Sequence, residues 1–242
     1  MIVAMVLAHL VGDYILQWDA LANWKSHAIQ GVLVHGAIVS AVTSVMALLI
    51  DTRWWPWAVF IGVTHTAIDA GWLWVNRRWH AANRSGRYPI VRLMIDQALH
   101  FSVIALALSL SGSIDSRGLI GQVVTAFSTQ RNLVIASAYA FVMMPAWILI
   151  EFAVYGLING SAPDFSQAIK NKYAGSLERG LMLTFVLLGQ MALVPMVALP
   201  RLIFDTPHVI GQPRATIYTV EWLASVAIAV LIGLGLKAVI RF

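Results

Sequence analysis

The chain has 242 residues, of which 60% are hydrophobic and only 11% are charged. A typical soluble domain has about 25% charged residues, so this composition excludes a soluble globular enzyme. The net charge of +5 would suit nucleic acid, but the basic residues are distributed as in a membrane protein, and we expect no nucleic-acid partner. Because the chain has no cysteine, disulfides, thiolate-bound zinc and iron–sulfur clusters are excluded.

Long apolar segments recur along the whole chain and predict an all-α, polytopic transmembrane helix bundle. A helix of about 20 apolar residues crosses the hydrocarbon core of a bilayer, and we expect six to seven such spans. The spans are predicted at residues 1–17, 28–50, 54–76, 88–110, 132–158, 180–200 and 217–240. The first is short with a polar end, and the sixth contains Pro195 and ends at Pro200, which weakens helical hydrogen bonding.

The distribution of basic residues predicts the orientation of this bundle. With the N-terminus outside, 11 of the 16 Lys and Arg residues lie in inside segments and 5 in outside loops. The positive-inside rule therefore favours an N-out, C-in topology. Most of the ten Trp residues lie near the ends of the predicted spans, as in an interfacial aromatic belt, so the lipid bilayer is the first partner that we expect.

The first four spans carry ionisable residues, which a lipid-facing helix excludes. Each such group costs roughly 2.5–3.5 kcal/mol on insertion scales, so it marks a functional site by default. The seven residues are His9, Asp13, His35, His65, Asp69, Asp96 and His100. Six of them form His/Asp pairs spaced four residues apart, and residues at i and i+4 share one helix face.

Depth in the membrane gives a second reason to group these seven residues. Counted from the loops that connect the first span to the second and the third to the fourth, all lie roughly 8–18 Å below the same membrane surface at 1.5 Å per residue. Two antiparallel hairpins would therefore bring four His and three Asp to one level. We predict that residues 1–110 form a four-helix core around a polar or metal site, followed by C-terminal transmembrane helices over 111–242.

A divalent metal site is the leading interpretation of this set, with a metal-free proton or ion relay and purely structural polar packing as alternatives. Imidazole and carboxylate ligands favour zinc, manganese or iron, and seven ligands suffice for one or two ions. Asp13, Asp69 and Asp96 are the candidate catalytic carboxylates. Gln17 continues the His9–Asp13 stripe and is expected to orient a ligand. Gln97 is a second candidate for this supporting role; it lies beside Asp96, but on a different helix face.

Further candidates lie outside this set. Glu151, in the fifth span, is expected either to complete the site or to pair with a basic residue. Residues 163–174 predict a short interfacial helix, whose Lys170 and Lys172 would meet anionic lipid.

An arginine cluster follows the third span and is a candidate for binding an anionic substrate, although positive-inside topology also explains it. The cluster consists of Arg77, Arg78, Arg84, Arg87 and Arg92.

The polar residues resemble a family of bacterial integral-membrane proteins, the domain of unknown function number 3307. The similar motifs are His9-x-x-Gly12-Asp13-x-x-x-Gln17, His35, His65-x-x-x-Asp69, Asp96-Gln97-x-x-His100, Gly175-Ser176-Leu177-Glu178-Arg179 and Leu188-Gly189-Gln190. The chain departs from the family in its interrupted sixth span and its added seventh span. The resemblance implies that the polar pattern recurs, in a protein of the bacterial inner membrane that is distantly like membrane-bound metal-dependent hydrolases; this last step is an analogy of fold.

Three functions remain open from the sequence. The first is a metal-dependent hydrolase that acts from the cytoplasmic side on a phosphoester or lipid-like substrate. The second is a transporter or channel for a metal ion or protons. The third is a non-enzymatic subunit that binds a cofactor such as haem within a larger membrane complex; a second copy of the chain is a further candidate partner.

Overall fold

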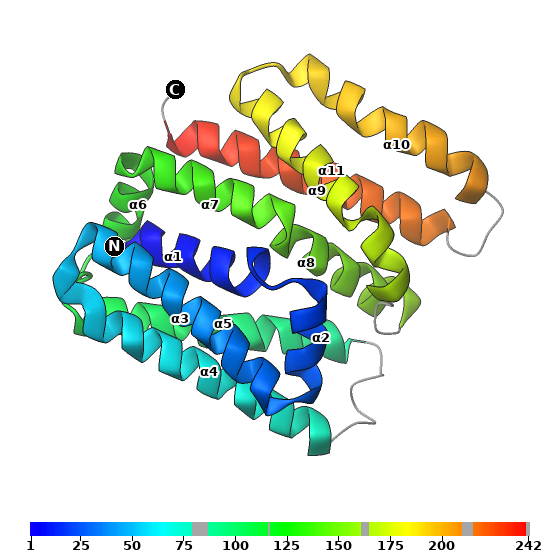
Figure 1. Cartoon of the computed structure of the whole chain (residues 1–242). Helices are drawn as coiled ribbons and strands as arrows, with labels where there is room; N and C mark the ends of the chain where they lie inside the picture. The colour runs from blue at the N-terminus through cyan, green and yellow to red at the C-terminus, as the bar shows by residue number, and fades with distance from the viewer. Residues whose placement is uncertain (79–86, 116, 161–164, 210–214, 241–242) are drawn as a thin grey trace. The chain divides into compact units, whose positions relative to one another are not determined.

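The computed structural model describes the chain except for residues 79–86, 116, 161–164, 210–214 and 241–242, and it describes only the backbone of 159, 165–171 and 204–209. The described residues form helices and connections, with no strand among them. The α-helices are α1 (Ile2–Leu10), α2 (Asp19–His27), α3 (Ile29–Ile50), α4 (Trp55–Arg78), α5 (Tyr88–Leu110), α6 (Leu119–Thr129), α7 (Arg131–Met143), α8 (Pro145–Val154), α9 (Phe165–Leu187), α10 (Val194–Val209) and α11 (Ala215–Val239) (Figure 1). The chain divides into unit 1 (residues 1–83 and 91–140) and unit 2 (84–90 and 141–242).

Five helical segments among the described residues are long and apolar enough to cross a membrane, which indicates a multi-pass membrane protein. They match five of the predicted spans and comprise Ile29–Ile50, Thr52–Arg78, Tyr88–Leu110, Arg131–Ile158 and Ala215–Val239. The predicted first span is instead part of a bent pair, Ile2–Ile15 and Asp19–His27, whose axes differ by 87°. This pair gives a sixth candidate span if it counts as one crossing.

The predicted sixth span, 180–200, is wrong as a single helix because the chain turns at Gly189. Gly189 adopts a left-handed conformation with φ of 75°. The N–H of Gln190 donates to the carbonyl of Phe185, and the N–H of Gly189 donates to that of Val186. These two bonds form the Schellman motif that ends a helix. Pro195 does not break a helix, since it lies in the first turn of α10, where proline is tolerated.

The short interfacial helix that the sequence predicts near 163–174 is not a separate element. From residue 165 onward this segment is the first part of α9, which continues without a break to Leu187. Residues 163 and 164 lie outside the described part of the chain.

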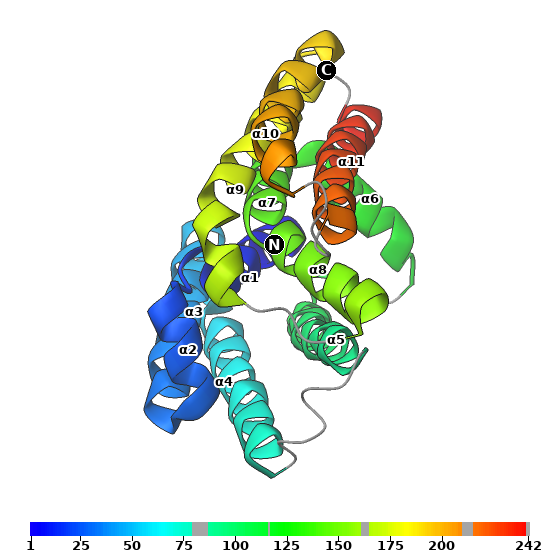
Figure 2. The ribbon, with the colours of Figure 1, turned by 90° about the vertical axis from the view of Figure 1, so that its right-hand side faces the viewer.

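Unit 1 has an apolar end and a polar end. At the apolar end, residues of α1, α3, α4 and α5 form one buried cluster, which includes Met5, Ala47, Ala58 and Ile104. Helices α3 and α4 lie side by side (Figure 2). The hydroxyl of Thr66 takes the space that a Cβ would need at Gly36. Such close packing sets the register of α3 against α4, so that His35 and His65 meet at the polar end.

The bend after α1 turns α2 across the first turn of α3 (Figure 1). The helix widens into a π-turn over Val11–Ile15, a distortion that is frequent at functional sites. Gly31 of α3 allows the close approach of α2, because a Cβ there would lie 2.5 Å from the backbone nitrogen of Lys25. The position of Lys25 is therefore set by a backbone contact as well as by its own side chain.

Substitution of Gly31 by alanine is expected to lower the stability of the protein by about 2–3 kcal/mol, because the added methyl group would overpack against the backbone of α2. Thermal unfolding in detergent would measure the loss. Gly71→Ala is the matched control, since nothing lies within 4 Å of a Cβ at that position of α4. Equal melting temperatures for the two variants would contradict the close approach of α2 and α3.

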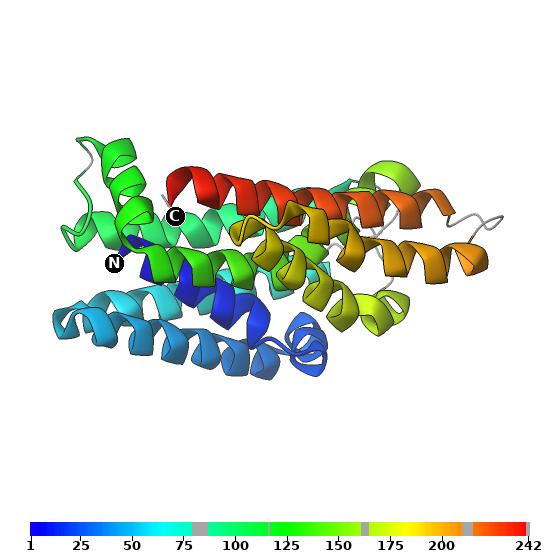
Figure 3. The same cartoon turned by 90° about the horizontal axis from the view of Figure 1, so that it is seen from above.

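Unit 2 is built around α9, α10 and α11, which run alongside one another (Figure 3). Pro145 ends α7 and starts α8, so carbonyl groups at the end of α7 have no helical partner. Arg179 of α9, which is 2% exposed, donates to the carbonyls of Val142 and Met143 and to the hydroxyl of Ser225. This buried arginine therefore caps the last residues of α7, which belong to unit 2, and links them to α9 and α11.

Candidate metal centre

Six ionisable side chains are buried together at the polar end of unit 1. They come from α1, the π-turn, α3, α4 and α5, and each is 6% exposed or less. The six are His9, Asp13, His35, His65, Asp69 and His100. The structure thus groups six of the seven ionisable residues that the sequence singled out.

The most compact part of this cluster consists of Asp13, His35, His65 and Asp69. The Nε2 atoms of His35 and His65 are 3.3 Å apart. Asp13 Oδ1 lies 3.0 Å from His35 Nε2 and 3.8 Å from His65 Nε2. Asp69 Oδ2 lies 3.5 Å from each of the two nitrogens. Four potential ligand atoms from three chain segments, the π-turn, α3 and α4, thus lie close to one another.

These separations fit the donor set of a metal ion. Nitrogen and carboxylate ligands at about 2.0–2.2 Å from a tetrahedral ion lie about 3.3–3.6 Å from one another. The triangle of Asp13, His35 and His65 has sides of 3.0, 3.3 and 3.8 Å, and the triangle with Asp69 has sides of 3.3, 3.5 and 3.5 Å. Two carboxylates and two imidazoles are a chemistry that zinc, manganese and iron accept.

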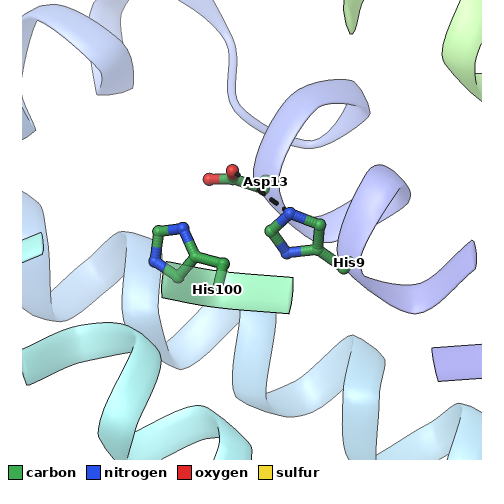
Figure 4. A group of neighbouring side chains, drawn as sticks. All are labelled: His9, Asp13 and His100. Carbon is green, nitrogen blue, oxygen red and sulfur yellow. Dashed lines mark ion pairs between the residues drawn. The ribbon is translucent and has the colours of Figure 1, made fainter. Parts of the chain in front are cut away.

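Two further triads surround this part of the cluster. His9, Asp13 and His100 have ligand atoms within 4.8 Å of one another (Figure 4), as do His65, Asp69 and His100. The rings of His65 and His100 stack with centroids 4.1 Å apart. Because Asp13, His65 and His100 are each shared by two triads, the ligands by themselves would allow more than one ion.

Several buried nitrogen and oxygen atoms of the cluster have no hydrogen-bond partner among the described residues. They are Nδ1 of His35, both ring nitrogens of His100 and Oδ1 of Asp96. An unmet buried polar atom costs about 1–3 kcal/mol, so these atoms point to a missing ligand or to water. His100 stands out because neither of its nitrogens is used.

Asp96 and Gln97 lie at the edge of the cluster. Asp96 belongs to none of the triads, but its Oδ2 is 3.7 Å from His100 Nδ1. The expectation that Gln97 points to a different face is wrong. Its amide accepts from His9 Nε2 at 3.0 Å and donates to Asp13 Oδ2 at 3.2 Å and to Asp96 Oδ2 at 3.0 Å. Gln97 therefore fixes the orientation of two potential ligands.

Sequence reasoning missed Lys25. Its Nζ donates to Asp69 Oδ2 at 3.3 Å and lies 3.7 Å from Asp13 Oδ1. One signal was available, because Lys25 is the only Lys or Arg among the first 52 residues. The contacts of Lys25 with Asp13 and Asp69 depend on the direction of α2, which cannot be predicted from the pattern of hydrophobic residues.

Gln17 and Glu151 were also predicted to support the site. The Oε1 atom of Gln17 has no partner among the described residues, and Gln17 follows the end of the π-turn, so the stripe does not continue to it. Glu151 is in unit 2, where it accepts from Trp147 Nε1 at 3.1 Å.

Four of the five predicted arginines lie in the described part of the chain. Arg77 donates to the carbonyl of His27, and Arg92 lies over the ring of Trp72. Arg78 and Arg87 are exposed. Arg84 lies outside the described residues. The role of these arginines in binding an anionic substrate therefore stays a prediction.

The fold and this site define an all-α, multi-pass membrane protein with a buried His/Asp cluster that could hold a metal ion. The chain belongs to the DUF3307 family, whose description is a protein of unknown function and whose model matches residues 1–135. The matched segment contains all the residues of the cluster. No curated protein and no solved structure matches the chain.

Proposed function

We propose that this protein is a membrane-embedded metal-dependent hydrolase that acts on a phosphoester or lipid-like substrate. The observation that carries the proposal is the convergence of Asp13, His35, His65 and Asp69, with ligand atoms 3.0–3.8 Å apart. His9 and His100 extend the same donor set. When bound, a divalent ion supplies Lewis-acid chemistry, since it polarises a phosphoryl oxygen and makes water more acidic.

Charge supports the same proposal. With ionised carboxyls, Asp13, Asp69 and Asp96 carry three negative charges, and Lys25 supplies one positive charge. Buried charges are strongly destabilising unless they are paired or bind a metal. The residual charge of about −2 corresponds to one divalent cation.

Asp96 is the residue that we assign as general base. Its side chain is 20% exposed, whereas those of Asp13 and Asp69 are 6% exposed, and its Oδ1 has no partner among the described residues. A base must be held near the reacting water while keeping a free acceptor atom. The hydrogen bond that Gln97 donates to Oδ2 holds Asp96, while Oδ1 can accept a proton.

The proposal includes the membrane in which the protein lies and its orientation there. We place the protein in the bacterial inner membrane with the N-terminus outside, because the basic residues favour that orientation. The polar end of unit 1 would then face the cytoplasmic side. The bent pair α1–α2 counts as one crossing in this arrangement, and anionic phosphate would reach the site from the same side as the arginines.

Metal content tests this proposal directly. Protein purified in mild detergent without a metal-affinity tag is expected to contain manganese, iron or zinc, measured by mass spectrometry. His35→Ala should abolish retention because the His35 side chain is fully buried between two carboxylates and a second imidazole. His27→Ala, at an exposed position of α2, should retain the metal. Equal metal content in both variants would exclude this centre.

A proton or ion pathway is the second candidate, because the polar contacts form a continuous chain. The chain of titratable groups runs from Asp13 through His35 and His65 to Asp69 and Lys25. Such a network can relay protons without a metal. Flux into proteoliposomes that His65→Ala abolishes, in protein free of metal, would favour this function over hydrolysis.

A further inference from the structure

Lys25 joins the two carboxylates at the compact part of the cluster. Its Nζ contacts Asp69 Oδ2 at 3.3 Å and Asp13 Oδ1 at 3.7 Å. These two oxygens are the same atoms that lie within 3.0–3.8 Å of the histidine nitrogens. The ammonium group therefore takes up carboxylate lone pairs that would otherwise be free for a cation.

The backbone keeps Lys25 at this position. The 87° bend sends α2 back over α3, and Gly31 lets the backbone of Lys25 approach within a distance that no side chain would allow. The Lys25 side chain is only 21% exposed. Withdrawal of this charge would require α2 to move or the side chain to leave both carboxylates.

The arrangement of ligands does not limit the number of ions, but the charge does. Three overlapping triads share Asp13, His65 and His100, so side chains are available for two ions. With Lys25 in place, the three carboxylates leave a charge of −2, which one divalent ion neutralises. A second ion would leave a charge of +2 in a buried site, which is strongly unfavourable.

We propose that Lys25 is a built-in cation that takes the place of a second metal ion and limits this centre to one divalent ion. The inference rests on the proposed metal centre and adds its stoichiometry. The lysine places one positive charge against both Asp13 and Asp69. The two-ion clamp of dinuclear phosphatases is then replaced here by one ion and one ammonium group, both available to the same anionic substrate.

Manganese binding by the full-length protein in detergent tests this inference. Wild type should bind one Mn²⁺ per chain, with the electron paramagnetic resonance spectrum of an isolated ion. Lys25→Met, which keeps the side-chain length without the charge, should bind a second ion or bind the first at least about tenfold more tightly. Lys25→Arg, which keeps the charge, should resemble wild type. Lys237→Met removes a lysine from unit 2 and should also leave binding unchanged.

The outcomes separate this inference from the metal centre itself. One ion in wild type and a second ion, or tighter binding, in Lys25→Met support the inference. One ion with equal affinity in both proteins overturns the inference and leaves the metal centre standing, and so does a spin-coupled pair of ions in wild type. Binding by neither protein overturns both. If Lys25→Met does not fold, Lys25→Gln and the wild-type spectrum decide the question in the same way.

Discussion

Substitution of Asp13 by asparagine is expected to weaken the binding of a divalent ion by more than about a hundredfold. Asp13 is shared by two of the three triads, and His35, Gln97 and Lys25 all contact its carboxylate. Loss of a residue that only orients a ligand typically weakens metal binding by 10–100-fold. The loss of a shared charged ligand should exceed that range.

The test is the affinity for Mn²⁺ or Zn²⁺, measured by competition with a chelator of known affinity. Gln97→Ala should fall in the 10–100-fold range, because Gln97 holds His9 and Asp13 and is not itself a ligand in this centre. Asp51→Asn, at an exposed carboxyl after α3, is the matched control. If a folded Asp13→Asn variant bound the ion with wild-type affinity, Asp13 would not be a ligand of the centre.

Much of the fold could be predicted because hydropathy acts over a whole segment. The five matched spans are long apolar runs, and the bilayer requirement for about 20 apolar residues leaves few alternatives. The break at Gly189 was missed for the converse reason. A single glycine in the left-handed conformation ends α9 through two hydrogen bonds, and averaging over a window of residues hides such a local motif.

The gathering of the polar residues could also be predicted, because two independent patterns agreed. The i and i+4 spacing placed His9 with Asp13 and His65 with Asp69, and the rise per residue placed the pairs at one depth. The structure brings these four residues together with His35 and His100. Their roles as ligands stay a prediction.

Two members of the site could not be read from these patterns. Successive helix positions point about 100° apart, which led to the wrong orientation for Gln97. Its long side chain reaches across this angle to His9 and Asp13. The position of Lys25 in the site depends on the 87° bend and on the contact of α2 with Gly31. Such tertiary contacts leave no periodic signal in the sequence.

Substitution of Asp96 by asparagine is expected to lower hydrolytic turnover by about 10²–10⁴-fold, the usual contribution of a general base, while metal content stays unchanged. Asp96 is outside the three triads and has a free Oδ1. The asparagine amide can still pair with Gln97, so the local structure should persist. Only the ability to accept a proton is removed.

Turnover of 4-nitrophenyl phosphate and bis(4-nitrophenyl) phosphate by metal-loaded protein provides the measurement. A loss confined to kcat, with the metal retained, separates a base from a ligand, because loss of a ligand such as Asp13 would remove the metal first. Asp96→Glu should recover part of the activity, and Asp115→Asn, at an exposed position between α5 and α6, should have no effect. Full turnover in Asp96→Asn would move the role of base to a carboxylate inside the cluster. The metal and the base would then compete for the same oxygens, which is the arrangement that the position of Asp96 avoids.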